Sequence, residues 1–318
     1  MRKRRSQIID LSISRHYHVT SRCVRGAYLL QDGDESRKTQ IEERLKELEA
    51  AFAVDVCSHS IMDNHFHVVL RLNPEEADRW TDRNVVERWY QIHPLRNGSR
   101  RQLPITEKWI ERELADTKQV AKTREKLCSA SQFMKDLKQP IAQQANRKDR
   151  RTGHFWDGRF HAVAILDDAA LLAVTTYVDL NPFAAGACER PEDARHTSLR
   201  ERVRALKVDA TLGEAEDALW LVPIEAIEEN ADGNEQKRQG LLRGLSETDY
   251  LKLVDSCARL VRAGKHHLDE NALPILERIH ITPDNFVTVL ERLCENSTRR
   301  GHVIGRPEVD RDVRDGRR

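Results

Sequence analysis

The spacing of apolar and polar residues changes several times along the first 72 residues. Residues 16–21 are rich in β-branched and aromatic side chains and predict a strand, and residues 54–61 predict another. Between them, residues 40–52 place apolar side chains at helical spacing and predict a helix. A polar turn then leads into a third predicted strand over residues 64–72. The predicted order is therefore strand, helix, strand, hairpin, strand.

The third of these strands carries two kinds of side chain. Because side chains of a strand alternate between its faces, His65 and His67 lie opposite the apolar positions. The apolar positions, expected to point into a core, are Phe66, Val68, Leu70 and Leu72. Two neutral imidazoles on one rigid strand can hold a divalent metal ion, and a metal ion with an open position can polarise a phosphate. The pattern therefore predicts a metal platform.

Residues 74–147 change to a polar, helical pattern without strand signals. They predict helices near residues 80–90, 110–114 and 129–146. Pro140 is expected to kink or divide the last of these helices. The whole block is interpreted as a helical insertion in a smaller domain.

A further helix, over residues 169–180, is predicted after a short strand at residues 161–166. Asp167 or Asp168 is expected to cap its N-terminus. The residues expected to pack on a core follow the helical repeat and are Leu171, Val174, Thr175 and Val178.

The same helix carries a candidate nucleophile. Tyr177 and Asn181 are four residues apart, so their side chains share one face, one turn from each other. Pro182 is expected to end the helix and to place Asn181 at its end. A metal ion on His65 and His67 needs further ligands, and the amide oxygen of Asn181 is a candidate. Tyr177 would then stand near the phosphate that the metal ion polarises.

A tyrosine in this position is suited to cutting and rejoining a nucleic-acid strand. A phenolate that attacks a phosphodiester forms a phosphotyrosine and releases a sugar hydroxyl, and the covalent link keeps the reactivity of the bond. The free phenol has a pKa of about 10, so it needs a metal ion, a base or a positive field nearby. Mg²⁺ or Mn²⁺ suits phosphate chemistry because both ions accept oxygen ligands and keep water positions open.

The histidine pair alone is a weak pattern. The chain contains a second pair at His16 and His18, and strand histidines are often structural. Cys57 and His59, on the second predicted strand, are a further candidate for a zinc cluster, although their spacing to other groups is irregular. Only the combination of a histidine pair with a later tyrosine and asparagine points to a nuclease.

The total charge neither favours nor excludes a nucleic-acid partner, because 53 Lys and Arg balance 52 Asp and Glu. Basic residues gather at residues 1–5, at residues 299–318 and between residues 147 and 159. At the two termini, solvated tails are an equally good interpretation. The middle group lies close to the predicted chemistry and is interpreted as a DNA contact. Its members are Arg147, Lys148, Arg150, Arg151 and Arg159.

Six scattered cysteines without Cys-x-x-Cys spacing are interpreted as reduced thiols. The basic start lacks the apolar stretch of a secretory signal, and no segment approaches the ~18 apolar residues of a transmembrane helix. These features predict a cytoplasmic protein without membrane contact. The composition changes again after residue 205, and residues 214–298 have a mostly helical pattern, for example at residues 275–279. Residues 1–205 and a helical region of residues 206–318 are therefore predicted as separate domains.

Three segments in a fixed order resemble a known family. They are residues 64–67 (Asn-His-Phe-His), 155–160 (Phe-Trp-Asp-Gly-Arg-Phe) and 177–186 (Tyr-Val-Asp-Leu-Asn-Pro-Phe-Ala-Ala-Gly). Together they are similar to the REP-associated tyrosine transposases, a branch of the HUH-class single-tyrosine nucleases. The resemblance covers residues 10–200. In one departure, Phe183 and Ala184 replace the valine and arginine that the family usually has after the tyrosine, which removes a phosphate or structural contact.

The resemblance implies an α+β fold with a ferredoxin-like βαββαβ core and an antiparallel sheet. It implies that His65, His67 and Asn181 bind the metal ion and that Tyr177 is the nucleophile. The implied substrate is single-stranded DNA with a hairpin or palindromic element, which is cut to leave a 5′-phosphotyrosine and a free 3′-hydroxyl.

The implied fold also places the first and third strands side by side. His16 and His18 are therefore expected near His65 and His67. For this second pair a packing or DNA-facing role is favoured over metal binding.

The predicted function is a metal-dependent transposase that cuts and rejoins single-stranded DNA in transposition and recombination. Two cuts would need two tyrosines, which favours a homodimer, although a monomer also fits this family branch. One alternative is a non-catalytic nucleic-acid-binding protein on the same sheet. Another is a zinc-dependent hydrolase that uses the histidines and whose activity survives the substitution Tyr177→Phe.

Overall fold

The computed structural model describes residues 9–31, 37–99, 101–211, 219–225, 240–263 and 303–304. The predicted helix at residues 275–279 and the basic clusters at the two termini lie outside the described residues.

The centre of the molecule is a sheet with the order β2-β3-β1-β4, in which neighbouring strands run antiparallel. Its strands are β1 (His16–Arg22), β2 (Val54–Ile61), β3 (His65–Leu72) and β4 (His161–Ile165). A short strand, β5 (Val303–Ile304), pairs in parallel with β4. The order and the directions are those of a ferredoxin-like βαββαβ core. They confirm the predicted fold class and the four predicted strands.

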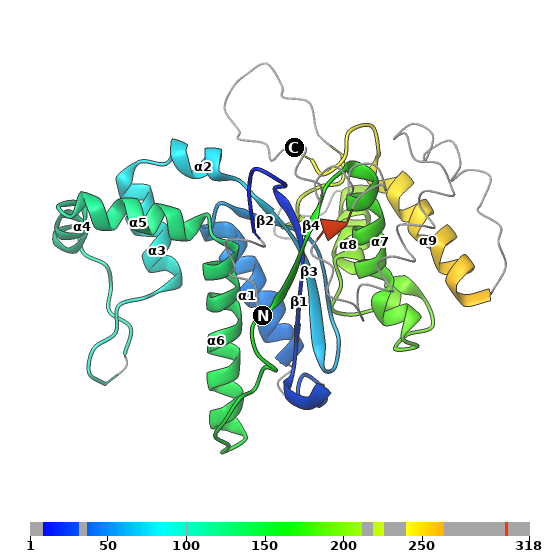
Figure 1. Cartoon of the computed structure of the whole chain (residues 1–318), viewed down its shortest axis with the longest axis horizontal. Helices are drawn as coiled ribbons and strands as arrows, with labels where there is room; N and C mark the ends of the chain where they lie inside the picture. Colours follow the sequence, from blue (N-terminus) through cyan, green and yellow to red (C-terminus); the bar gives the residue numbers. More distant parts are fainter. Residues whose placement is uncertain are drawn as a thin grey trace.

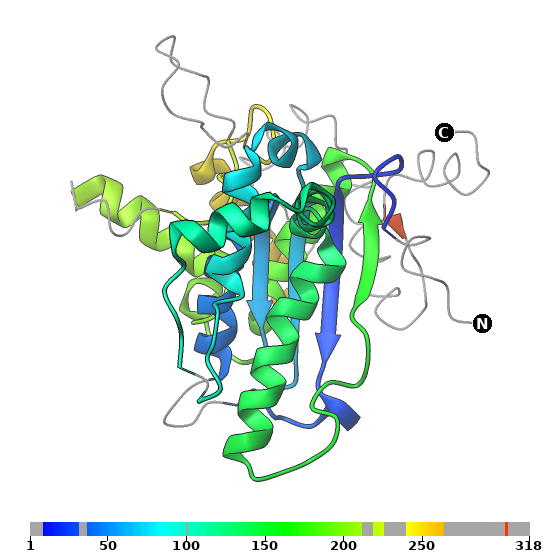
Figure 2. The ribbon, with the colours of Figure 1, turned by 90° about the vertical axis from the view of Figure 1, so that its left-hand side faces the viewer.

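One face of the sheet is covered by α1 (Arg37–Ala51) and α6 (Ala130–Lys148), which pack against each other (Figures 1 and 2). These are the two crossover helices of the core. The apolar positions of β3 are buried on this side, as the alternation predicted: Phe66, Val68, Leu70 and Leu72. Helix α6 runs through Pro140 without being divided.

The opposite face is covered by α7 (Asp168–Ala184), which packs on β2 and β3 and in turn contacts α9 (Glu247–Ala263). Figure 1 shows these helices across the sheet from α1 and α6. Helix α8 (Ser198–Thr211) contacts β2 and crosses the predicted domain boundary. Apolar residues of α7 and α9 form one cluster with sheet residues such as Val69. The described part of residues 206–318 therefore packs directly on the sheet domain.

Helix α7 begins where the sequence predicted and ends later. Asp167 caps its N-terminus by accepting a hydrogen bond from the backbone N–H of Ala170 at 2.8 Å. The expectation that Pro182 ends the helix is wrong, because the N–H of Ala185 still donates to the carbonyl of Asn181 at 3.0 Å. Proline removes one donor from the helix, but the turns on either side of it stay closed. Asn181 therefore lies inside α7 and not at its end.

The helices that follow β3 form an arm beside the sheet (Figure 1). They are α2 (Pro74–Arg79), α3 (Asp82–Ile92), α4 (Glu107–Leu114) and α5 (Thr117–Leu127). Thr81, Thr106 and Asp116 cap the last three by accepting a backbone N–H. The arm occupies most of the predicted insertion, whereas α6, which the prediction included in it, belongs to the core.

The described cysteines form no disulfide and are Cys23, Cys57, Cys128, Cys188 and Cys257. Within the described ranges, every helix is too short or too polar to span a membrane.

Candidate active site

The two histidines of β3 lie on the face of the sheet that α7 covers. His65 is half-buried and His67 is buried, and their ring centroids are 4.9 Å apart. His18 on the neighbouring strand β1 points to the same face and stacks on His67, with a centroid distance of 5.1 Å. The period-two alternation predicted from the sequence therefore brings three imidazoles together.

Tyr177 meets these histidines from α7. Its ring lies edge-on to His67 at a centroid distance of 5.8 Å, and edge-on to His18 at 6.2 Å. The side chain is half-buried at the border of the core that α7 forms with the sheet. The structure thus brings the candidate nucleophile and the histidine pair, far apart in sequence, into one site.

Asn64 fixes the tautomer of His65. Its amide nitrogen donates to the carbonyl of Gly26 at 3.0 Å, so its amide oxygen faces Nδ1 of His65 at 2.6 Å. An amide oxygen only accepts, and therefore Nδ1 of His65 carries the proton and Nε2 keeps its lone pair. Metal-binding histidines are commonly oriented by such a partner. No role was predicted for Asn64, although its position directly before His65 was a signal.

His67 has a similar partner in His18. Nδ1 of His67 and Nε2 of His18 are 2.9 Å apart and share one hydrogen bond. Nε2 of His67 is buried and has no hydrogen-bond partner among the described residues. The hydroxyl of Ser60, opposite His67 on β2, is likewise buried without one. If His67 donates through Nδ1, its unpartnered Nε2 carries a lone pair and no proton. A buried lone pair without a partner costs less folding free energy than a buried N–H without one.

The histidines on this face are neutral at neutral pH. Burial lowers the pKa of His16, His18 and His65 to about 4 and that of His67 well below its ordinary value. The positive charge of Arg22 acts in the same direction on His65. Neutral imidazoles have the lone pair that a metal ion needs.

The candidate ligands for the predicted metal ion are two histidine nitrogens and one amide oxygen. In the part of the chain that the structure describes, no three His, Cys, Asp or Glu side chains converge to hold a metal ion. The unpartnered Nε2 of His67 and the oriented Nε2 of His65 are two donors of suitable chemistry. The amide oxygen of Asn181 remains as the predicted third donor. Such a set leaves positions open for phosphate oxygens.

Asn181 lies one turn after Tyr177 and is half-buried. Helix α7 ends beside the turn that joins β2 to β3, because Pro182 and Asp63 line one cavity there. His65 follows that turn. Asn181 is therefore displaced from Tyr177 toward the end of the sheet at which His65 lies.

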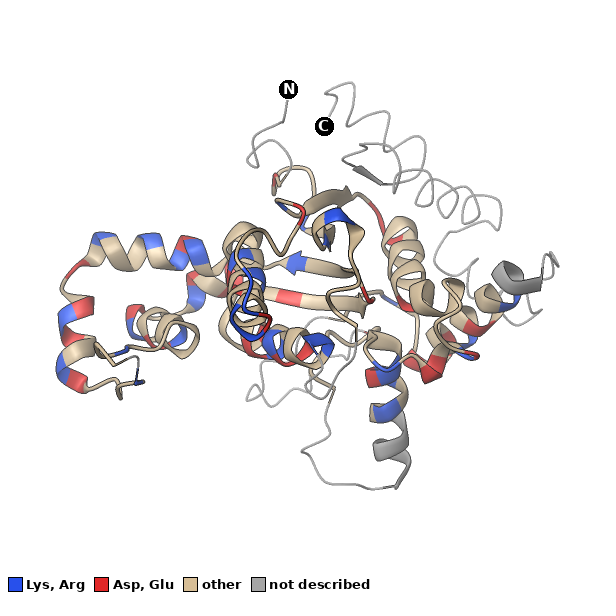
Figure 3. Ribbon diagram, turned by 90° about the horizontal axis from the view of Figure 1, so that it is seen from below, with Lys and Arg blue, Asp and Glu red and all other residues tan. Residues whose placement is uncertain are grey.

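The predicted DNA-binding residues lie at this same end. The loop after α6 pairs with the end of β1, since the N–H of Asp157 donates to the carbonyl of Arg22 at 2.9 Å. Arg22 in turn lies opposite His65 in the sheet. Figure 3 looks onto the molecule from this side and shows basic and acidic residues interspersed along the helices of the arm. The predicted basic residues are all exposed: Arg147, Lys148, Arg150, Arg151 and Arg159.

The zinc cluster considered for Cys57 and His59 is wrong. A β-bulge between Val56 and Ser58 reverses the alternation of β2 at this point. Cys57 therefore packs in the cluster under α7, whereas His59 points to α1 on the other side of the sheet.

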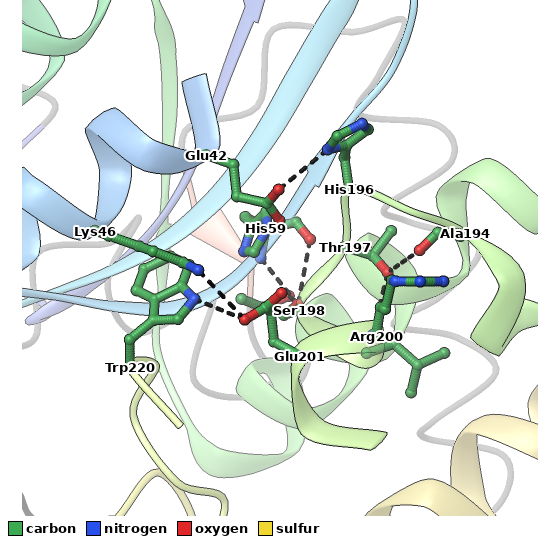
Figure 4. A network of polar contacts seen from close by, with 12 residues as sticks. Glu42, Lys46, His59, Ala194, His196, Thr197, Ser198, Arg200, Glu201 and Trp220 are labelled. Atoms are coloured by element: carbon green, nitrogen blue, oxygen red, sulfur yellow. Dashed lines mark hydrogen bonds and ion pairs between the residues drawn. The ribbon is translucent and has the colours of Figure 1, made fainter. Parts of the chain in front are cut away.

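His59 belongs instead to a structural network (Figure 4). The carboxylate of Glu42 lies 3.2 Å from Nε2 of His59 and 3.1 Å from Nδ1 of His196. Burial alone would raise the pKa of Glu42, but the hydrogen bonds from His196 and His59 outweigh it and lower the pKa to about 2. The network joins α1, β2 and the segment before α8.

Asp179, two residues after Tyr177, joins α7 to α8 and α9 through hydrogen bonds. One carboxyl oxygen accepts from the hydroxyl of Ser198 and from the N–H of Leu199 at 3.1 Å. The other accepts from the hydroxyl of Tyr250 at 2.6 Å. Asp179 is fully buried, and burial raises its pKa. The partners lie on α8 and α9, so the C-terminal part of the chain holds the tyrosine helix in place.

No protein-family model matches the chain, and no curated protein matches it. A solved structure described as a REP-associated tyrosine transposase bound to a REP hairpin is similar to it, with a TM-score of 0.37 and 13% sequence identity. The likeness covers 64% of this chain and 86% of that chain. That protein belongs to the family whose motifs the sequence resembles. The functional conclusion depends on the residues of this chain itself.

Proposed function

We propose that the protein is a metal-dependent nuclease and strand transferase that acts on single-stranded DNA through Tyr177. The phenolic oxygen attacks a backbone phosphorus, a bond between oxygen and phosphorus forms, and the bond to the 3′ oxygen breaks. The phenolic proton is released, and the leaving 3′ oxygen takes up a proton and becomes a 3′-hydroxyl. The strand stays joined to Tyr177 through its 5′-phosphate, and attack by a 3′-hydroxyl reverses the step.

The observation that carries the proposal is the edge-on contact of Tyr177 with His67 and His18. A histidine pair on a strand and a tyrosine on a helix are each ordinary. Their meeting on one face of the sheet, beside a buried imidazole nitrogen without a hydrogen-bond partner, is what a tyrosine nuclease requires.

His65, His67 and Asn181 would hold the metal ion, Mg²⁺ or Mn²⁺, which would polarise the phosphate and stabilise its developing charge. The chain's own residues prepare the site for it. Asn64 and His18 orient the two imidazoles, and burial keeps both neutral.

Charge and the motifs support a DNA substrate. The exposed basic residues between 147 and 159 lie at the end of the sheet where His65 stands, and phosphates are the groups that such residues bind. A hairpin or palindromic element is the feature of the DNA that the motif resemblance implies. A homodimer and a cytoplasmic location remain predictions from the sequence.

A second candidate, a non-catalytic DNA-binding protein, is favoured by one departure from the family pattern. Phe183 is buried and Ala184 is exposed at the end of α7. An arginine at position 184 would have offered an exposed positive charge there, and this chain lacks it.

The test is formation of a covalent complex between protein and DNA. The full chain is incubated with Mn²⁺ and a pool of labelled single-stranded oligonucleotides that carry a hairpin with randomised flanks. A complex that resists denaturation is then measured for the wild type, for Tyr177→Phe and for Tyr90→Phe. Tyr90 lies in the arm against Trp109 and provides a control for loss of a tyrosine hydroxyl elsewhere.

We expect the complex with the wild type and with Tyr90→Phe, and none with Tyr177→Phe. Binding without cleavage in all three proteins would establish the non-catalytic alternative. Cleavage that persists in Tyr177→Phe would instead establish a hydrolase.

A further inference from the structure

The loop that follows β1 carries the most exposed large side chain of the described apolar and aromatic residues. Tyr28 is 67% exposed, compared with 46% for the next, Leu11. A single exposed ring needs no explanation by itself. Its position and its neighbours give it a function here.

The loop is fixed to the residues that directly precede His65. Asn64 donates from its side chain to the carbonyl of Gly26 at 3.0 Å, and the carbonyl of Asn64 accepts from the N–H of Cys23 at 2.8 Å. The N–H of Leu30 donates to the carbonyl of Asp63 at 2.8 Å. Tyr28 lies between these anchors. The loop backbone that carries the exposed side chain of Tyr28 is therefore held next to the end of β3 at which His65 lies.

Exposed basic residues lie in the same loop as Tyr28. Arg22 and Arg25 are exposed in and next to the loop. The N–H of Val24 donates to the carbonyl of Phe155 at 2.9 Å, which joins the loop to the exposed basic segment after α6. Figure 2 shows the two loops side by side at the end of the sheet. An aromatic ring among arginines is the arrangement with which proteins hold unpaired nucleic-acid strands.

One arginine in each of the two joined loops has a left-handed backbone conformation. Arg25 (φ 56°) and Arg150 (φ 49°) are the non-glycine residues with positive φ in the described part of the chain. A left-handed conformation is unfavourable for a residue with a side chain. Arg150 adopts it directly after α6, where such a residue commonly ends a helix, and the N–H of Arg151 donates to the carbonyl of Asn146 at 2.9 Å. Arg25 adopts it in the loop after β1, outside such a helix end.

We propose that Tyr28 is a stacking platform for an unpaired base of the DNA, with Arg25 and Arg150 on the phosphates beside that base. The proposal rests on the proposed function for its substrate class. A phenol ring stacks on any base, so Tyr28 contributes affinity for single strands and little preference for sequence. It cannot contribute in the same way to a closed duplex, in which the bases are stacked on each other.

The test compares binding of a labelled 20-nucleotide oligo(dT) strand with binding of a blunt duplex of equal length, by fluorescence anisotropy. The variants are Tyr28→Ala, Tyr28→Phe and, as a control, Leu103→Ala, which removes another exposed side chain in the arm. We expect Tyr28→Ala to weaken single-strand binding by about 5- to 150-fold and to leave duplex binding nearly unchanged. Tyr28→Phe and the control are expected to bind like the wild type.

Arg25→Gly gives an independent readout. Glycine accepts the left-handed backbone, so this variant is expected to unfold at a higher temperature than the wild type while it binds the strand more weakly. A purely structural role for Arg25 would not separate these two effects.

Normal binding by Tyr28→Ala would overturn the proposal, and so would an equal loss with Tyr28→Phe, which would indicate a hydrogen bond from the hydroxyl. The covalent-complex assay separates this failure from failure of the proposed function. If the wild type forms the complex and Tyr28→Ala binds normally, only the stacking platform is wrong. If Tyr28→Ala loses binding while the wild type forms no complex, the platform stands and the nuclease is wrong.

Discussion

The two faces of the central sheet differ in the side chains that β3 contributes to them. On the face covered by α1 and α6, strand β3 contributes only apolar side chains to a continuous core. On the face covered by α7, the same strand contributes His65, His67 and Arg71 together with the buried Val69. Among the described residues, several buried polar atoms on this second face have no hydrogen-bond partner, for example Nε2 of His67 and Oγ of Ser60, and Nδ1 of His59 is such an atom on the first face. Unpartnered polar groups reduce stability, so a fold retains them where they serve chemistry.

Other buried polar groups on the second face do have hydrogen-bond partners. Arg71 and Asp55 form a buried ion pair at its other end, with 2.6 Å between nitrogen and oxygen, and Asn73 donates to the same carboxylate at 2.6 Å. Among the described residues, Nε2 of His16 opposite Arg71 has no hydrogen-bond partner, and neither has Nε2 of His67 beside Tyr177. The difference teaches that burial of polar groups alone does not mark the site. What distinguishes Nε2 of His67 is that the same ring contacts the candidate nucleophile Tyr177.

The largest expected contrast comes from adjacent residues of β3 that point to opposite faces. Phe66→Ala should lower the free energy of unfolding by about 3–5 kcal/mol, because it leaves a cavity in the core. His67→Gln should lower it by only about 0.5–1.5 kcal/mol, since one hydrogen bond is at stake. The same His67 variant should lose the metal-dependent covalent complex. Urea unfolding and the complex assay measure the two effects, and similar unfolding energies for both variants would contradict the account.

The two buried tyrosine hydroxyls on opposite faces provide the next contrast. Tyr250→Phe removes a donor from the buried carboxyl of Asp179 and should cost about 1.5–3 kcal/mol of stability if that group is charged. Tyr17→Phe removes two hydrogen bonds with the backbone of Asp10, one that the hydroxyl donates to the carbonyl and one that it accepts from the N–H, and should cost about 0.5–1.5 kcal/mol for each. Because Asp179 lies two residues after Tyr177, only Tyr250→Phe should also slow formation of the covalent complex at saturating DNA. Equal rates for the two variants would show that α9 does not position the tyrosine helix.

The two His-x-His pairs sharpen the comparison within the second face. His18 holds the ring of His67, so His18→Gln should weaken Mn²⁺ binding by about 10- to 100-fold, the usual effect of removing such a partner. His16 lies further along β1, opposite Arg71 in the sheet, and His16→Gln should leave Mn²⁺ binding unchanged. Isothermal titration with the metal alone measures both affinities. An equal loss in both variants would mean that the effect is a general one on the strand.

The last contrast is a pH dependence of stability. The pKa of His16 falls from 6.5 to about 4 on folding, mainly through burial. Between these values the unfolded chain binds more protons than the folded one, so stability is present above pH 6.5 and declines as the pH falls toward 4. One such group contributes at most about 1.4 kcal/mol per pH unit. His16→Gln should therefore make the slope of unfolding energy against pH shallower, and an unchanged slope would show that His16 does not titrate in this way.

Local patterns predicted the strands and the side-chain directions of β3, because alternation is set by the backbone itself. These patterns gave wrong predictions at two positions, in β2 and at the end of α7. The bulge at Cys57 reversed the alternation of β2 and sent His59 to the other face. Pro182 did not end α7, because the helical turns on either side of it remained closed.

Contacts between segments that are distant in the chain could not be predicted from local sequence patterns either. The carboxyl of Asp179 finds its donors on α8 and α9, and no spacing in the chain announces Ser198 or Tyr250 as partners. The meeting of Tyr177 with His67 was implied by the family resemblance, and its geometry came only from the fold. Sequence patterns therefore predicted the components of the site, and packing assembled them.

The central claim is that Tyr177 and the histidine pair of β3 form one catalytic site. Mass spectrometry of peptides after reaction with the oligonucleotide pool tests this claim most directly, because the chain contains five tyrosines. The account predicts a nucleotide on Tyr177 alone, in the presence of Mn²⁺ and with intact His65 and His67. A nucleotide on another tyrosine, or on Tyr177 in a His67→Gln variant without metal ion, would contradict it.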